Sequence, residues 1–282
     1  MGSSALPAPL LAADRLSRWA AVAIGISIPV STALDNILLV VVLLAWLAGG
    51  GYREKWAAAR ANPVAMAALL LFGVLLAGTL WGDRYPGDGA VFLAKYADLL
   101  AVPLLVYLFR DARHRSHALA ALAAGLVLTL AVSYLVLLGV LSPEKPLAPD
   151  PLYPLAFKFK LTHNILMAWA AFLFAHFAAR ATATVPRCTW TILSLLAAAN
   201  VLFLVDGLTG QVMLGAYAVY GTWRWKGWRG LAVGMAGVGL GAVLLAGASD
   251  SFRGRLERIG LSSPASSDKP SKATSAFSSA HG

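Results

Sequence analysis

The sequence predicts an all-α fold, a polytopic integral membrane helical bundle with about nine transmembrane helices. Hydrophobic residues make up 59% of the 282 residues, and charged residues make up only 13%. The mean hydropathy is +0.71, and the apolar residues form long runs instead of alternating with polar ones. Because soluble domains carry roughly 25% charged residues, this composition excludes an ordinary cytosolic enzyme.

About nine apolar runs approach the length of a membrane span, which is about 20 residues for a hydrocarbon core of ~30 Å. The first two runs are short and flank a tight turn around Asp35, a pattern that favours a hairpin, and Pro29 favours a bend there. The predicted spans are Arg18–Ser31, Asn36–Gly50, Val64–Gly82, Ala90–Phe109, Ala118–Leu141, Leu161–Ala179, Thr189–Val205, Gly210–Thr222 and Gly230–Ala248.

The spans divide the chain into four regions. We predict an N-terminal cytoplasmic segment over residues 1–17, a transmembrane helical domain over 18–248, a basic periplasmic segment over 249–260 and a disordered, serine-rich tail over 261–282. Residues 1–13 lack the arrangement of a cleaved signal peptide, so the first span is expected to act as a signal anchor.

The placement of basic residues predicts the orientation. Every loop on the N-terminal side contains Lys or Arg, whereas the opposite turns near Asp35 and Asp206 contain none. Because cytoplasmic loops carry an excess of Lys and Arg, we expect the N-terminus to be cytoplasmic and the C-terminus to lie outside. The net charge is +10. We expect part of it to anchor the cytoplasmic side and the rest to form outward basic groups that suit an anionic substrate. We expect no nucleic-acid partner.

Several kinds of site are absent from the sequence. Cys188 is the only cysteine, which excludes a disulfide framework or a multi-cysteine metal site within the chain. We find no phosphate-binding loop, zinc helix motif, serine nucleophile elbow or dinucleotide fingerprint. We therefore expect no metal and no cofactor.

Polar groups at the outer ends of the spans are the candidate functional residues, because unpaired polar groups in a span cost about a few kcal/mol. Lys95 lies near the outer start of its span with Asp98 on the same helix face, so the two form either a local ion pair or a ligand site. Lys158, Lys160 and His163 form either a membrane anchor or an anion-binding cluster, in which His163 donates to an anion or carries a proton.

Two further segments suit a phosphate group. In the turn Asp206–Gly210, glycines and the free amides of the following helix, at Thr209 and Gly210, allow close approach of an anion, although a simple tight turn explains the same residues. Arg253 and Arg255 follow the last span on the outer face, against the usual preference for basic residues inside. Arginine binds phosphate in bidentate geometry, whereas the alternative is a solvated stretch on anionic headgroups.

Several short motifs occur in order between residues 15 and 260. They are Ile-Pro-Val-Ser with Asp-Asn-Ile-Leu in Ile28–Leu38, Ala-Asn-Pro in Ala61–Pro63, Ala-Lys-Tyr in Ala94–Tyr96, Thr-His-Asn in Thr162–Asn164, Leu-Thr-Gly in Leu208–Gly210 and Ser-Phe-Arg-Gly-Arg-Leu in Ser251–Leu256. With the predicted topology, this series resembles the O-antigen ligase and O-antigen polymerase family, polytopic glycosyltransferases that use undecaprenyl-pyrophosphate-linked glycans at the periplasmic face.

The resemblance implies an O-antigen ligase-like glycosyltransferase of lipopolysaccharide biosynthesis in a bacterial inner membrane. Its partners would be an undecaprenyl-pyrophosphate-linked glycan, a lipid A-core acceptor and membrane lipids, and it needs no cofactor. The substrate-binding residues that it implies are Lys95, His163, Arg253, Arg255, Thr209 and Gly210.

Two departures from the family pattern affect the expected activity. Leu208 stands where the family has an arginine before Thr-Gly, which removes one expected pyrophosphate contact. The resemblance ends after about Ile259, where the family continues into a large periplasmic region that is thought to hold the catalytic base. We therefore expect the chain to lack the family's C-terminal part, and no catalytic residue is assigned.

Two other functions remain open at this point. One is a secondary transporter of an anionic or lipid-like solute, with Lys95, Asp98 and His163 as relay groups. The other is a non-catalytic remnant that still folds and binds lipid. Transport predicts polar residues at the bilayer midplane, whereas a transferase predicts polar residues concentrated at one face, and the few intramembrane charges here lie toward the outer face.

Overall fold

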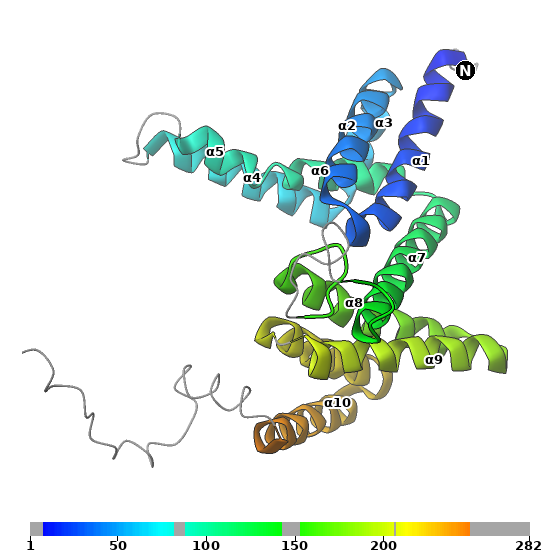
Figure 1. The fold of residues 1–282 in the computed structure, drawn as a ribbon. Coiled ribbons are helices and arrows are strands. Elements are labelled where there is room, and N and C mark those ends of the chain that lie inside the picture. The colour runs from blue at the N-terminus through cyan, green and yellow to red at the C-terminus, as the bar shows by residue number, and fades with distance from the viewer. Residues whose placement is uncertain (1–7, 82–87, 143–152, 206, 249–282) are drawn as a thin grey trace, which may run out of the picture. The chain divides into compact units, whose positions relative to one another are not determined.

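A computed structural model of the chain describes residues 8–81, 88–142, 153–205 and 207–248, which form helices and no strands (Figure 1). This result confirms the all-α prediction. They fall in two compact units, Met1–Leu214 and Gly215–Gly282. The elements are α1 (Ala8–Val30), α2 (Thr32–Ala48), α3 (Tyr52–Ala61), α4 (Pro63–Trp81), α5 (Asp88–Ala94), α6 (Asp98–Leu108), α7 (Ala112–Leu137), α8 (Lys160–Arg180), α9 (Thr184–Ala199), the π-helix η1 (Asn200–Leu204) and α10 (Leu208–Ala248).

Helices α1 and α2 form the predicted hairpin. Only Ser31 separates them, and its hydroxyl caps α2 by accepting a hydrogen bond of 3.3 Å from the Leu34 amide. Pro29 lies in the last turn of α1, where it cannot donate a backbone hydrogen bond, and the helix ends at the next residue, Val30. The two helices then pack side by side (Figure 1).

Helix α7 packs closely on α1 through two glycines. A Cβ atom on Gly25 would lie 2.7 Å from the Ala118 carbonyl oxygen, and one on Gly125 would lie 2.8 Å from the Ile26 carbonyl oxygen. Larger side chains would therefore separate the helices. Such backbone approach at small residues is the usual way in which membrane helices pack, because lipid supplies no hydrophobic driving force between them.

The remaining helices of the first unit pack against this framework. An apolar core joins α1, α2 and α6 through Ala20, Ala21, Val42, Leu104, Tyr107 and Leu108. Helix α6 runs back along α4, while α8 and α9 pack on each other and on α7. Exposed leucine and valine side chains, such as Leu70 on α4 at 70% exposure, suit contact with lipid.

The structure supports fewer membrane spans than the nine predicted. Among the described residues, four helical stretches are long and apolar enough to cross a membrane: Gly89–Leu108, Ala112–Leu137, Lys160–Arg180 and Thr184–Leu204. A fifth arises if α2 and α3, bent by 119°, count as one span. The described part of the chain thus has four or five helical stretches able to span a membrane, and the prediction of nine spans is not supported.

Charge and length explain the difference. Helix α1 carries Asp14, Arg15 and Arg18 within its first half, so a membrane-length stretch of it always contains three charges. Helix α2 has only 17 residues, and the apolar part of α4, Pro63–Thr79, is also short. Apolar composition predicts spans at these positions, but it does not show where each helix begins and ends or how many charges it carries.

In the second unit, α10 forms a bent pair of helical arms. Gly227 has φ 59° and ψ −140°, outside the helical region, and it divides the eighth predicted span from the ninth. A Cβ atom on Gly234 would lie 2.3 Å from the Thr222 hydroxyl oxygen, so the two arms lie close together beyond the bend. Neither arm is among the helices long and apolar enough to cross a membrane.

The predicted basic segment 249–260 and the serine-rich tail 261–282 lie outside the described residues. The same holds for residues 1–7, so the predicted N-terminal segment 1–17 is described only from residue 8, where α1 begins.

The α1–α7 contact predicts the effect of a single methyl group. Gly125→Ala should destabilise the protein by about 1 to 3 kcal/mol, because the added carbon meets backbone atoms of α1. Thermal unfolding in detergent measures this change. Gly73→Ala is the matched control, since a Cβ at this helical position meets nothing within 4 Å. It should be neutral or stabilising by up to about 1 kcal/mol. Equal effects of the two substitutions would contradict close packing at Gly125.

Candidate functional site

The first polar cluster surrounds Asp35 at the turn between α1 and α2. Its carboxylate accepts a hydrogen bond of 2.5 Å from the Ser27 hydroxyl and forms an ion pair of 3.3 Å with the Lys158 ammonium. The same ammonium donates to the Thr32 hydroxyl at 2.8 Å. Lys158 is only 7% exposed, so its charge depends on these partners. We call Ser27, Thr32, Asp35 and Lys158 the Asp35 cluster.

A non-helical segment, residues 153–159, carries Lys158 into this position. Leu155 and Ala156 in this segment are fully buried, which anchors it among the helix ends. Phe157 has φ +61°, a left-handed conformation that a bulky residue rarely adopts. Strained backbone of this kind persists only where the surrounding packing holds it, and here it orients the chain just before Lys158.

A second cluster lies inside the first turns of α8. His163 is fully buried, and its Nε2 lies 3.1 Å from Oδ1 of Asn200. The Asn200 amide nitrogen donates to the Ser133 hydroxyl at 2.8 Å, and that hydroxyl donates to the Pro154 carbonyl oxygen. The chain of hydrogen bonds thus connects η1, α8, α7 and the segment before α8.

The π-helix η1 starts at Asn200, at the end of α9. Its wider turn interrupts the regular ladder, and π-turns of this kind are frequent at functional sites. Beside it, the Asn164 amide donates to the Val205 carbonyl oxygen at 3.3 Å. We call Ser133, His163, Asn164 and Asn200 the His163 cluster.

The turn that follows η1 packs directly on Asn164. A Cβ atom on Gly210 would lie 2.7 Å from the Asn164 Cβ, and one on Gly207 would lie 2.0 Å from its Nδ2. The glycines therefore permit the close approach of this turn to α8. Two amide oxygens here, Asn164 Oδ1 and Gln211 Oε1, are buried and have no hydrogen-bond partner among the residues described, so both can accept from a hydroxyl donor.

The structure brings together some of the predicted site residues. His163 and Gly210 lie on either side of Asn164, and Thr209 is exposed in the first turn of α10. Lys95 lies elsewhere, exposed in the break between α5 and α6. Its ammonium forms no ion pair with Asp98 or with any other residue in the described ranges. Arg253 and Arg255 lie outside the described residues.

Sequence reasoning missed the partners that complete the two clusters. The predicted role of Asp35 is that of a turn residue, and no prediction concerns Ser133 or Asn200. Their only signal in the sequence is a polar residue inside an apolar run, which costs free energy unless it is paired. The pairing itself joins positions far apart in the chain and becomes visible only in three dimensions.

Comparisons with protein-family models, with curated proteins and with solved structures find no match to this chain.

The Asp35–Lys158 pair predicts a strong coupling between two distant positions. Asp35→Asn should destabilise the protein by about 2 kcal/mol or more, because it leaves a buried ammonium without its counter-charge. Combining it with Lys158→Met should cost less than the sum of the two single substitutions, with a coupling of about 1 kcal/mol or more. A double-mutant cycle measured by thermal unfolding in detergent tests this.

Lys160→Met serves as the control for the loss of a nearby charge. Lys160 lies over the Tyr153 ring at 3.7 Å and has no contact with Asp35, so it should show no coupling with Asp35→Asn. Additive costs for Asp35→Asn and Lys158→Met would show that the ion pair does not stabilise the fold.

Proposed function

We propose that this chain is an O-antigen ligase-like protein of a bacterial inner membrane. It binds an undecaprenyl-pyrophosphate-linked glycan at the Asp35 end of its helices, which faces the periplasm, while the N-terminal end faces the cytoplasm. In the transfer that the family performs, a hydroxyl oxygen of lipid A-core attacks the anomeric carbon of the glycan. The bond from this carbon to the pyrophosphate breaks, undecaprenyl pyrophosphate leaves with the electron pair, and a base takes the hydroxyl proton.

The observation that carries the proposal is that Thr162–Asn164 packs on Leu208–Gly210, and that Ile28–Leu38 pairs with the segment just before α8. Ile28–Leu38, Thr162–Asn164 and Leu208–Gly210 resembled the family as separate stretches of sequence. In the fold, Asp35 pairs with Lys158 just before α8, and Asn164 packs on Gly210. Motifs that carry a shared site are expected to meet in this way, whereas chance matches along a chain have no reason to do so.

The proposed roles follow from the chemistry of each group. Lys95, Arg253 and Arg255 remain the pyrophosphate ligands that the sequence predicts, and the start of α10 at Thr209, which is exposed, adds backbone amides and a helix dipole that stabilise a leaving anion. His163 is fully buried, so its proposed role is to position Asn200 through their hydrogen bond.

The distribution of charge favours this function over transport. In α7, α8 and α9 the charged residues occur in the end turns, and the middle of each helix is uncharged. A relay across the membrane needs polar groups at the midplane of several spans. A site at one membrane face needs them only at the helix ends.

Donor binding tests the proposal. The full chain in phosphatidylcholine nanodiscs should bind an undecaprenyl-pyrophosphate-linked glycan, and Arg255→Ala should weaken binding by about tenfold or more, since hydrogen bonds to charged groups contribute about 1.5 to 3 kcal/mol. Arg60→Ala, which removes an exposed arginine from α3 that belongs to neither polar cluster, should leave binding unchanged.

Three outcomes would count against the proposal. The parent chain would fail to bind the glycan lipid, or Arg60→Ala would weaken binding as much as Arg255→Ala. Alternatively, proteoliposomes would take up an anionic solute along an ion gradient and lose this uptake on Lys95→Ala, which would support a transporter.

A further inference from the structure

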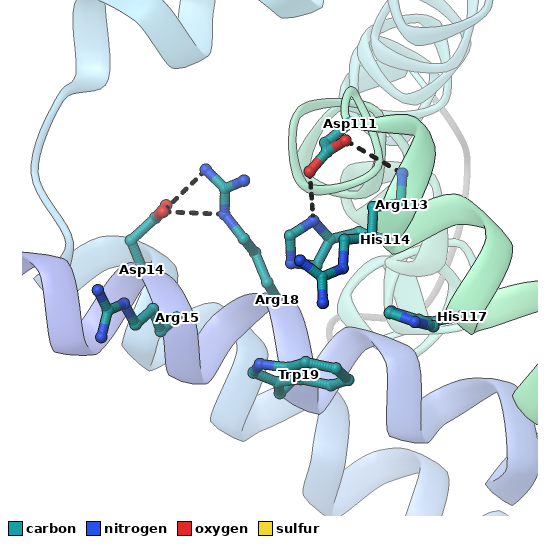
Figure 2. A pocket seen from close by; sticks show the side chains of 8 residues that line it. All are labelled: Asp14, Arg15, Arg18, Trp19, Asp111, Arg113, His114 and His117. Atoms are coloured by element: carbon teal, nitrogen blue, oxygen red, sulfur yellow. Dashed lines mark hydrogen bonds and ion pairs between the residues drawn. The ribbon is translucent and has the colours of Figure 1, made fainter.

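A pocket of about 390 Å³ lies at the other end of the helices, where the starts of α1 and α7 meet. Figure 2 shows Arg18 paired with Asp14 on the α1 side and His114 paired with Asp111 on the α7 side, with Trp19 and His117 below them. The residues that line the pocket are Asp14, Arg15, Arg18, Trp19, Asp111, Arg113, His114 and His117. None of them belongs to the site proposed above.

Two carboxylates hold two of the donors in place. Asp14 receives hydrogen bonds from Arg18 at 2.8 and 2.9 Å, and Asp111 lies 2.9 Å from Nδ1 of His114 (Figure 2). Asp111 also caps α7 by accepting from the Arg113 amide at 3.0 Å. The bond from this amide, followed by that from His114, lowers the pKa of Asp111, so the carboxylate stays ionised at neutral pH and keeps orienting His114.

Other donors in the pocket have no partner. The Arg15 and Arg113 guanidinium groups form no hydrogen bond or ion pair within the described part of the chain. His117 Nδ1 is buried, and it too lacks a partner there. Three arginines outnumber two aspartates, so the pocket is positive even when both imidazoles are neutral.

The aromatic wall suits a pocket at a membrane interface. Trp19 stacks on the His117 ring with centroids 5.5 Å apart and meets the His114 ring edge-on at 6.0 Å. Half of the Trp19 side chain, 52%, is exposed, as expected for a tryptophan at the headgroup level. The apolar stretch of α7 that can cross a membrane begins at Ala112, directly beside the pocket.

The preference of cytoplasmic loops for basic residues does not explain this arrangement. That preference concerns the number of Lys and Arg residues near the ends of spans. Exposed arginines that line no pocket, such as Arg60 on α3, satisfy it equally well. Here arginines from two helices line one hollow, and carboxylates fix the orientation of Arg18 and His114. Ordered and free donors around one space are what an anion-binding site requires.

We propose that this pocket binds a phosphate group, carried either by a soluble phosphate compound or by the headgroup of an anionic phospholipid. The forked donors of arginine match the oxygens of a phosphate in bidentate geometry, and the volume leaves room for the group that carries the phosphate. The site is separate from the proposed donor site, because the pocket and the Asp35 cluster lie at opposite ends of α1, near Asp14 and Ser27 respectively.

Binding measurements on the full chain in phosphatidylcholine nanodiscs test the proposal. Calorimetric titration with inorganic phosphate examines a soluble ligand, and native mass spectrometry after exchange into mixed lipid compares retained phosphatidylglycerol with phosphatidylcholine. Arg113→Gln should weaken the binding that is observed by about tenfold, the effect of losing about 1.4 kcal/mol. The Arg113 side chain has no partner in the described structure, so its loss should not disturb folding.

Arg60→Gln is the matched control, since it removes the same charge from an exposed arginine that does not line the pocket. Phosphate binding that Arg113→Gln weakens identifies a soluble ligand, and phosphatidylglycerol retention that it weakens identifies a lipid headgroup. Either result supports the site. Binding of neither probe, or equal losses in Arg113→Gln and Arg60→Gln, would overturn it. Binding of the glycan lipid should be unchanged by Arg113→Gln, which separates this test from that of the proposed function.

Discussion

The carboxylate of Asp35 is the contact on which the first unit depends, because three separate segments share it. Ser27 contacts it from α1, Asp35 itself lies in the first turn of α2, and Lys158 contacts it from the segment before α8. A buried ammonium is stable only beside a counter-charge, so this pair fixes where the chain enters α8. The positions of His163 and Asn164, one turn further along, follow from that entry point.

Polar contacts in the first unit gather at the helix ends, and the helix surfaces between them are apolar. One end carries the Asp35 and His163 clusters, and the other carries the arginine-lined pocket together with Lys55, which is buried against the Trp46, Tyr52 and Tyr107 rings. A membrane favours this division, since it penalises polar groups at its midplane and tolerates them at both interfaces. Chemistry on charged lipids is therefore expected at the faces of such a protein.

The sequence allowed the α1–α2 hairpin and the helices α7, α8 and α9 to be predicted, because long apolar runs and Pro29 are local signals. The break between α5 and α6 at Lys95–Ala97 was not predictable, since these residues are compatible with a continuous helix. The pocket was missed for another reason. Arg18 and His117 are far apart in the chain and no local pattern links them, so only the packing of α1 on α7 reveals that they share a site.

The packing of α1 on α7 also links the polar groups at the two ends of these helices. Helix α1 carries Arg18 at one end and Ser27 toward the other, and α7 likewise carries His114 and Ser133. The backbones of the two helices approach closely at Gly125, so one helix cannot slide along the other without clashes. Each site therefore depends on contacts that lie outside it. Gly125, whose side chain is a single hydrogen atom, thus contributes to the geometry of both sites, because it sets the register of the two helices that carry them.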